Sequence, residues 1–415
     1  MPNFTSSPRT LKRNRSERIF RAICQSAIAL TALFLVFLIS NLAINAIPSL
    51  TQYVVRLSLV VDPAKVDATQ IAAGDFQAIV RTAIAAEFPD VTAKPEKKKL
   101  VKLFSTSIAE NLQRQVTADP SLIGKTITVE GPLAADADSF LKGQQMSVSA
   151  LGENSDFEAR ALAKLKEAGK LTREFSWSLL TNGDSRSPEK AGLRGAFMGS
   201  LFTIAITLLV ALPLGVAAAL YLEEFARQSR LRDLIEVNIN NLAAVPSIIF
   251  GLLGLAVFVN KFGLPRSSPL VGGLVLALLV LPTIIIASRA ALRSVPPSIR
   301  EAALGVGASH QQSVFHHVLP LAVPGILTGT ILGVARALGE TAPLLMIGMV
   351  AFIADVPTRI TDAATALPVQ VYLWSALPEA AFRSRTSVAI LALLIVLFVF
   401  NALAIWLRNR FERRW

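Results

Sequence analysis

The sequence predicts an all-α polytopic membrane protein with six transmembrane helices and an inserted extracytoplasmic α+β domain. Of its 415 residues, 53% are hydrophobic and only 17% are charged. Several apolar runs have the length of about 20 residues that crosses roughly 30 Å of hydrocarbon as a helix. A long polar stretch separates the first of these runs from the others. This composition excludes an ordinary soluble multidomain protein.

Six segments are apolar enough to be transmembrane helices. They are residues 22–44, 196–222, 237–259, 270–287, 323–352 and 388–407. A cleaved signal peptide is the alternative for the first segment, but its length and the lack of a small-x-small cleavage site favour an uncleaved anchor.

Basic residues near these segments indicate the orientation of the chain. One side holds Arg9, Lys12, Arg13, Arg15, Arg18, Arg21, Arg227, Arg230, Arg232, Arg289, Arg293, Arg300, Arg408, Arg410, Arg413 and Arg414. The opposite short loops hold only Lys261, Arg266, Arg359, Arg383 and Arg385. The positive-inside rule therefore places the first side, and both termini, in the cytoplasm. The net charge of +12 belongs to this topology and does not indicate nucleic-acid binding.

The chain divides into four parts. Residues 1–21 are a basic cytoplasmic tail, 22–44 the first transmembrane helix, 51–192 the extracytoplasmic domain, and 193–415 a five-helix core that includes a cytoplasmic loop at 289–322.

Within residues 51–192, periodicity predicts helices at 76–88 and 97–112 and strands at 53–61 and 126–131. Loops are expected at 87–99 and 181–190. The lysine run Lys97 to Lys99 is interpreted as a solvated helix start, with an acidic partner as the alternative.

The chain lacks the usual residues of an enzyme or metal site. Its single cysteine, Cys24, lies in the first apolar segment, so neither an intrachain disulfide nor a cysteine metal cluster can form. Three histidines, His310, His316 and His317, are too few and too local to indicate a metal site. No phosphate-cradling G-x-x-x-x-G-K-[ST] motif occurs. We therefore expect no cofactor in this chain and no ATP-driven chemistry of its own.

The cytoplasmic loop contains the string PPSIREAALGVGASHQQSVFHHVLP, residues 296–320. Ser298 with Glu301, and Ser309 with Gln312, fit the spacing of capping boxes. The glycines between them favour a turn, and Pro320 is expected to limit the second helix. The loop is therefore predicted to form two short helices joined at a glycine turn.

The same loop resembles the EAA loop of permease subunits in bacterial ABC importers. The matching residues are Glu301, Ala302, Ala303, Gly307, Leu319 and Pro320. His317 stands where that family usually has an apolar residue. The strings NNLAAVPSIIFGLLG (240–254) and ARALGETAPLL (335–345) resemble the phosphate-specific permeases more closely, and the resemblance extends from about residue 191 to the C-terminus.

This resemblance implies an ATP-driven importer of inorganic phosphate, with the loop as the docking site for its ATP-binding subunits. It also implies a second, similar permease subunit across the Gly325 to Gly333 stripe or nearby, two ATP-binding subunits, a phosphate-binding protein outside the membrane, and membrane lipid around the chain. The long domain at 51–192 is not part of the family's shorter form.

Two charges interrupt the fifth apolar segment. Gly325, Gly329 and Gly333 repeat at the small-xxx-small spacing of close helix packing. On a continuous helix, Arg336 and Glu340 project within roughly 20° of Gly329. A charge that faces lipid at mid-helix costs at least about 2.5 kcal/mol, so this face is expected to meet protein or an aqueous path. Pro343 predicts a kink near Gly339 at the same depth.

Phosphate suits this pair chemically. Arginine can donate twice to phosphate oxygens, and a carboxylate can accept a hydrogen bond from the proton that hydrogen phosphate retains and sulfate lacks. The alternative is an ion pair that only fixes helix packing, but the arginine-first order is the weaker helical arrangement. Asn241 and Ser247 are further path candidates, with helix capping or bridging as their alternative.

Other classes of function are kept as alternatives. A permease for sulfate, molybdate or another oxyanion would carry a similar pair. An ion-coupled secondary carrier also needs charges within the membrane, but has no need of an ABC-type docking loop. A sensor receptor would explain residues 51–192 but would need only one or two spans.

Overall fold

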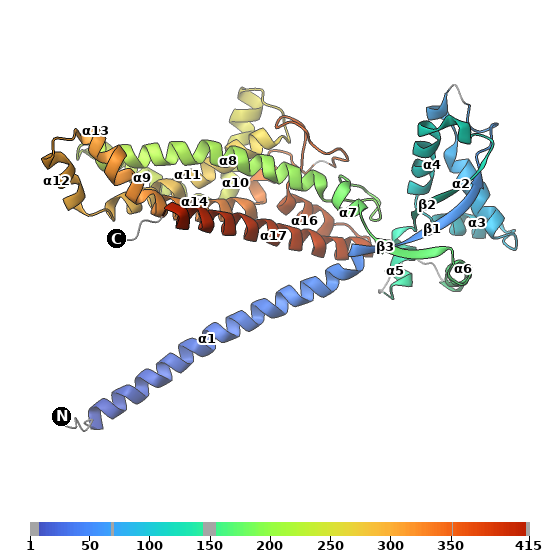
Figure 1. Ribbon diagram of the computed structural model, residues 1–415, viewed down its shortest axis with the longest axis horizontal. Helices are drawn as coiled ribbons and strands as arrows, with labels where there is room; N and C mark the ends of the chain where they lie inside the picture. The colour runs from blue at the N-terminus through green and yellow to red at the C-terminus, as the bar shows by residue number, and fades with distance from the viewer. Residues whose placement is uncertain (1–7, 68–69, 144–154, 351, 412–415) are drawn as a thin grey trace.

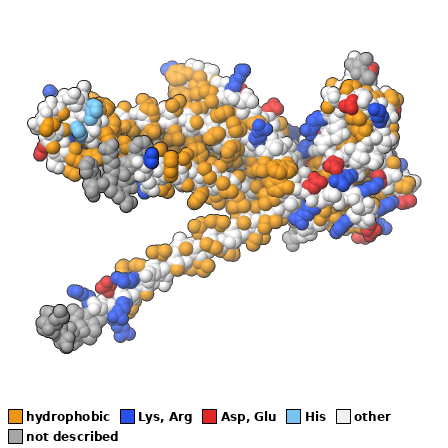
Figure 2. Space-filling view, viewed as in Figure 1, with side chains coloured by type: hydrophobic (Ala, Val, Ile, Leu, Met, Phe, Trp, Pro, Cys, Tyr) orange, Lys and Arg blue, Asp and Glu red, His pale blue; other side chains and the backbone are white. Residues whose placement is uncertain are grey.

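The computed structural model describes residues 8–67, 70–143, 155–350 and 352–411. Arg413 and Arg414, which the charge pattern assigns to the cytoplasmic side, lie outside these residues. Long helices form the larger part of the molecule, and a smaller unit with a β-sheet lies beyond one end of them (Figure 1). Hydrophobic side chains cover the long helices, whereas charged side chains gather on the smaller unit (Figure 2).

Among the described residues, five helices are long and apolar enough to cross a membrane, or six spans if one bent pair counts as a span. The long helices are α1 (Pro8–Ala46), α8 (Arg194–Leu220), α11 (Pro269–Arg293), α14 (Leu319–Gly339) and α17 (Ala380–Phe411). The predicted multi-pass helical membrane protein is thereby confirmed.

The third predicted span, residues 237–259, is wrong as a continuous helix. The structure has α9 (Arg230–Ala243) and α10 (Ser247–Gly254) here, bent by 100° and followed by a π-helical turn, Leu255–Lys261. Pro246 explains the bend, because proline has no amide hydrogen to donate and disfavours helical geometry in the residue before it.

The fifth predicted span, residues 323–352, is wrong at both ends. The helix begins earlier, with α13 (His310–Ser313) and a π-helical turn (Val314–Val318) leading directly into α14. Pro320 therefore does not end a helix; it lies in the first turn of α14, where a missing amide hydrogen is tolerated. The helix ends at Gly339 and a short helix, α15 (Ala342–Met346), follows, so the predicted break before Pro343 is confirmed.

Helix α11 is the centre of the membrane core. It packs against both α8 and α14 through largely buried side chains such as Val275 and Ile284. Gly273 allows close approach to α8, because a Cβ there would lie 2.5 Å from the Cβ of Ile206. Thr207 of α8 donates to the carbonyl oxygen of Gly273 at 3.1 Å, which ties the two helices together.

The smaller unit, called the sheet unit here, comprises residues 51–175. Its antiparallel sheet has the order β2-β1-β3, from β1 (Thr51–Val60), β2 (Thr126–Pro132) and β3 (Leu171–Phe175). Side chains of β1 alternate between the core and solvent: Leu57 and Leu59 are buried, whereas Arg56 and Ser58 are exposed. The strands predicted at 53–61 and 126–131 are confirmed; the short β3 was not predicted.

Five helices complete the core of the sheet unit. They are α2 (Phe76–Glu87), α3 (Lys94–Lys102), α4 (Ser107–Ala118), α5 (Ala135–Leu141) and α6 (Ser155–Glu167). The helix predicted at 76–88 is confirmed. The single helix predicted at 97–112 is wrong, because Phe104 forms a β-bridge with Leu133 and separates α3 from α4.

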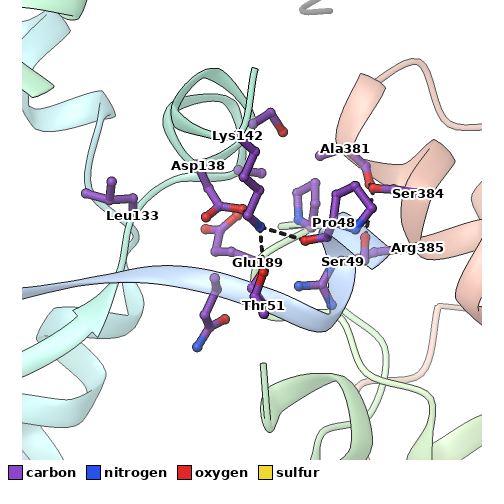
Figure 3. Close-up of a pocket in the computed structure, with 14 residues that line it drawn as sticks. Pro48, Ser49, Thr51, Leu133, Asp138, Lys142, Glu189, Ala381, Ser384 and Arg385 are labelled. Atoms are coloured by element: carbon purple, nitrogen blue, oxygen red, sulfur yellow. Dashed lines mark hydrogen bonds and ion pairs between the residues drawn. The ribbon is translucent and has the colours of Figure 1, made fainter. Parts of the chain in front are cut away.

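The sheet unit joins the membrane helices through a polar junction (Figure 3). Lys142, at the end of α5, donates to the carbonyl oxygen of Pro48 at 2.8 Å and also contacts the Thr51 carbonyl and the Asp138 carboxylate. Burial lowers the pKa of Lys142, and the charge of Asp138 opposes this effect. The lysine therefore bridges α5 to the chain that leaves α1.

Two side chains from α17 complete the junction. Ser49 donates to Ser384 at 2.7 Å, and Arg385 donates to the carbonyl oxygen of Ala191. These contacts surround a small cavity of about 20 Å³. The connecting segment between the junction and α8 contains α7 (Ser178–Thr181), and α16 (Leu367–Ser375) precedes α17.

Candidate substrate path and docking surface

Arg336 and Glu340 lie at the break that follows α14. Arg336 is in the last turn of α14, and Glu340 is the first residue beyond it, with an extended ψ of 121°. The Nε of Arg336 is 3.7 Å from the Oε1 of Glu340, and their side chains are 41% and 21% exposed. Neither side chain has a second hydrogen-bonding or ionic partner in the described ranges. At this distance the pair is ionic without a close hydrogen bond, so the guanidinium retains donors for an anion.

The two interrupted helices meet beside this pair. A Cβ on Gly251 of α10 would lie 2.7 Å from the Cα of Pro343 in α15, so only glycine permits this contact. Ser247 is one turn before Gly251 and shares its face of α10. Asn241 is exposed on α9. Within the described part of the chain, no hydrogen bond joins either of these polar residues to Arg336 or Glu340.

The glycine stripe of α14 packs against α11. A Cβ on Gly325 would lie 2.5 Å from the Cβ of Ala291, and Gly333 would meet Val280 at the same distance. Gly329 faces Ala287 in the same way. Because α11 of the same chain occupies this stripe, a second permease subunit does not lie across it, and a position near the stripe stays a prediction. The small residues Ala287 and Ala291 complete a close helix contact.

The predicted two-helix loop is present, with one difference at its start. Helix α12 (Pro297–Gly305) has Pro296 as its N-cap and no side-chain cap. The expected cap at Ser298 is wrong, because this residue lies inside the first turn, where its hydroxyl no longer faces the free amides. At the second helix the capping box is confirmed: Ser309 accepts from the Gln312 amide at 3.2 Å, and Gln312 accepts from the Ser309 amide at 2.8 Å.

Helix α12 presents an exposed surface at the end of the molecule. Glu301 and Ala302 are exposed, whereas Ala303 is buried beneath them. The turn after them contains Gly307 at a φ of +91°, which glycine adopts without strain. Val306 beside it is 86% exposed, an unusual position for an apolar side chain that no neighbour covers. At the base of the loop, Leu319 and Pro320 are half-buried.

A network of ion pairs holds this loop to the membrane helices. Glu223 and Glu224 lie in the π-helical turn that ends α8, Tyr221–Phe225. Arg300 of α12 donates to Glu224 at 2.6 Å, and the side chain of Glu224 is only 4% exposed. His310 of α13 is 2.8 Å from the carbonyl oxygen of Glu224 and packs its ring edge-on against Phe225.

The same network extends to α11 and α9. Arg289 pairs with Glu236 at 2.8 Å and with Glu223 at 3.3 Å, and Arg293 pairs with Glu223 at 2.8 Å. Sequence reasoning counted these arginines only as signals of orientation and omitted the glutamates. The Glu223-Glu224 pair at the end of an apolar segment was the available signal, because two acidic residues there need basic partners.

An apolar helical core with a charge pair at a helix break, and an exposed two-helix loop at one end, define a polytopic transport permease. Residues 211–415 match the family of binding-protein-dependent transport system inner membrane components, and residues 7–150 match a domain of unknown function, DUF3333.

Among its relatives, the chain is 34% identical over 225 residues to the phosphate transport system permease protein PstA of Haemophilus influenzae, covering 54% of this chain and 78% of that protein. It is 31% identical over 245 residues to PstA 1 of Mycobacterium tuberculosis H37Rv, covering 59% and 78%. The probable ABC transporter permease YqgI of Bacillus subtilis is 35% identical over 173 residues, covering 41% and 58%. The chain belongs to the PstA family of transport permeases, which confirms the resemblance seen in the sequence.

A likeness to a solved structure is weaker. Inward-facing MetNI methionine ABC transporter matches with a TM-score of 0.42 and 18% identity, covering 53% of this chain and 96% of the matched chain.

Proposed function

We propose that this chain forms part of the membrane path of an ATP-driven importer that moves inorganic phosphate across the bacterial inner membrane. The observation that carries this proposal is the Arg336–Glu340 pair at the break between α14 and α15. Two relatives of this chain carry the name phosphate transport system permease protein, which supports phosphate as the substrate.

The two side chains divide the work of anion binding. Arg336, which is 41% exposed and has donors to spare, attracts the anion and orients its oxygens. Glu340 repels an anion that carries no proton, but accepts a hydrogen bond from the P–OH group of hydrogen phosphate. The opposed charges keep binding weak enough for release, as conduction requires. Ser247 and Asn241 are proposed to line the same path.

Helix α12 is proposed to dock an ATP-binding subunit. The surface offered comprises Glu301, Ala302 and Gly307, with Ala303 buried beneath them and Leu319 and Pro320 half-buried at the base of the loop. The ion pairs of Arg300 and Arg289 would carry a push on α12 to α8, α9 and α11. The chain would work with a second permease subunit, two ATP-binding subunits and an extracytoplasmic phosphate-binding protein, with ATP hydrolysis on the separate subunits.

The orientation is proposed from charge and from shape. The basic clusters beside α9, α11 and α17 place the end with α12 and α13 in the cytoplasm. Helix α1 begins and α17 ends at this same end, and the sheet unit lies at the opposite one (Figure 1). We therefore assign both termini to the cytoplasm and residues 51–192 to an extracytoplasmic α+β domain.

The test is ATP-dependent phosphate uptake by the complete transporter in proteoliposomes. Arg336→Ala and Glu340→Ala should each lower uptake by at least about tenfold, the effect of losing roughly 1.4 kcal/mol at the path. Arg383→Ala is the matched control, because this arginine is exposed at the start of α17 and has no ionic partner in the described ranges. Retained uptake in both path variants would remove the pair from the path.

Substrate choice has its own test. Glu340→Gln keeps the shape of the side chain but removes the charge, so sulfate uptake should rise relative to phosphate uptake. Wild-type transport of sulfate at the phosphate rate would assign the chain to oxyanions in general. Uptake driven by a proton or sodium gradient without ATP would assign it to the secondary carriers.

A further inference from the structure

The sheet unit contains a second open pocket, between α2 and α3. Its volume is about 490 Å³, and its lining is mostly apolar. Ile84, Phe88 and Leu100 form the floor and are buried, and Val101 is half-buried beside them. Ala85 is exposed at the opening. The pocket is therefore large enough to take a bulky apolar side chain in contact with buried groups.

Basic side chains surround the opening. Arg81 of α2 and Lys97, Lys98 and Lys102 of α3 line the pocket, and all four are exposed. Residues 94–102 contain five lysines and one glutamate, whereas residues 51–192 as a whole contain 18 basic and 18 acidic residues. The positive charge is therefore local to this rim.

The rim charges are only partly balanced by their neighbours, since the buried Glu158 of α6 interacts electrostatically with Lys102. In the described part of the chain, none of the four makes an ion pair or a side-chain hydrogen bond. The nearest acidic residues at the end of α2 are engaged elsewhere, since Asp90 pairs with Lys164 and Glu87 with Lys170. Four like charges around one opening repel one another, so an anionic occupant would relieve an unfavourable field.

The shape of this field favours a ligand with several negative charges. A fatty carboxylate would fill the apolar floor but bring only one charge to four cations. An anionic membrane surface would meet the lysines but leave the pocket empty, and α3 lies on the side of the sheet unit away from the membrane helices (Figure 1). A peptide with several carboxylates and one large apolar residue satisfies both the rim and the floor.

We propose that the pocket between α2 and α3 binds an acidic segment of an extracytoplasmic protein, anchored by one bulky apolar side chain. The anchor enters the cavity above Phe88 and Leu100, and the carboxylates pair with the basic rim. This site is separate from the path at Arg336, and its failure would leave the proposed transport function untouched.

The test uses the full chain in neutral phosphatidylcholine nanodiscs. The probe is a fluorescein-labelled peptide of Asp and Glu residues with a central Phe-Leu pair, and the readout is fluorescence anisotropy. A second peptide has Ser-Ser in place of Phe-Leu. Lys98→Glu with Lys102→Glu reverses the rim, and Ala85→Trp fills the opening without changing charge. Arg114→Glu with Lys125→Glu is the matched control, because it changes the same charge away from the pocket.

Binding of the anchored peptide should weaken at least about tenfold in the rim variant and in Ala85→Trp, and about tenfold when Phe-Leu is removed. The control variant should keep its affinity within about twofold, since screening isolates distant charges. No binding at about 1 mM peptide would overturn the proposal. Equal weakening in the control variant, or indifference to the anchor, would reduce the effect to general charge attraction and also overturn it. Decanoate that binds more tightly than the peptide would reassign the pocket to small amphiphilic carboxylates.

Discussion

Arg300 of α12 donates to Glu224 at the end of α8 at 2.6 Å, and one guanidinium thereby joins the proposed docking helix to a membrane helix. The same side chain donates to the carbonyl oxygens of Leu292 and Val295 at 3.0 and 2.8 Å, which caps the end of α11. Lysine could not reproduce this arrangement, because it lacks the planar set of donors. Any movement of α12 must therefore displace both α8 and α11.

The first prediction concerns this pair. Glu224→Gln should lower stability by about 3 to 5 kcal/mol, because it leaves a partly buried arginine without its charged partner. Uptake should fall more than binding of the ATP-binding subunit, since α12 itself is intact. Thermal unfolding in detergent and co-purification of the subunit measure the two effects. Arg293→Gln is the control: Arg293 is 54% exposed, and such a pair contributes at most about 1 kcal/mol. Equal losses in both variants would contradict the prediction.

The second prediction concerns the contact between α14 and α11. Gly325→Ala should destabilise the protein by about 1 to 3 kcal/mol, because the added methyl group would lie 2.5 Å from the Cβ of Ala291. Ala291→Gly in the same chain should recover part of this loss by removing the opposing methyl group. Gly305→Ala is the control, since a Cβ there meets nothing within 4 Å. The unfolding temperatures of the three variants measure these effects. If Ala291→Gly restores no stability to Gly325→Ala, the two residues do not pack directly against each other.

The third prediction separates a path role from a structural ion pair. Exchange of the two charges, Arg336→Glu with Glu340→Arg, keeps an oppositely charged pair at the same two positions. A pair that only fixes packing should tolerate the exchange. A path for an anion should not, and we expect phosphate uptake to fall at least about tenfold. The measurement is uptake normalised to the amount of assembled transporter, with wild-type rates in the exchanged protein as the contrary outcome.

The fourth prediction concerns helix capping in the docking loop. Ser309→Ala should cost about 1 kcal/mol, because it removes the acceptor for the Gln312 amide in a formed capping box. Ser298→Ala should have almost no effect, since Ser298 caps nothing in α12. Hydrogen exchange of the α13 amides measures the difference. Matched protection in the two variants would show that the box contributes little.

The fifth prediction is a pH dependence at the junction. Burial raises the pKa of Asp136 above 3.8, and the charge of Glu379 raises it further. A raised folded pKa stabilises the fold only below the unfolded pKa, and this stabilisation is lost as pH rises through the folded pKa. Asp136→Asn should therefore raise the unfolding temperature at pH 7, with a gain that shrinks as the pH approaches 3.8. A gain that is constant with pH would exclude the ionisation as its cause.

Sequence patterns predicted secondary structure correctly where the structure of a segment depends on residues within that segment. The alternation of β1, the periodicity of α2 and the capping box at Ser309 depend on neighbouring residues, and all three were predictable. The break before Pro343 was predictable for the same reason. The prediction of one helix at 97–112 failed, because a β-bridge from Phe104 to the distant Leu133 decides the end of α3.

The candidate site was predictable only as a set of residues. Arg336 and Glu340 stood out because charge within an apolar segment is costly. The ion pairs of Glu223 and Glu224 join residues more than 60 positions apart in the chain. Two adjacent acidic residues indicate that basic partners are needed, but no local pattern identifies which arginines they are. The helix that packs against the glycine stripe could not be predicted either. A small-xxx-small pattern indicates that some helix approaches closely, but it does not identify that helix.

The sequence by itself determined that this protein crosses the membrane several times and carries a loop of two short helices joined at a glycine turn, because apolar length, flanking charge and turn residues act within one segment. The tertiary structure alone decided that α11 fills the groove of α14, that Arg300 ties α12 to α8, and that α2 and α3 enclose a basic-rimmed pocket. These features depend on which distant surfaces pack together, and packing is a property of the whole chain.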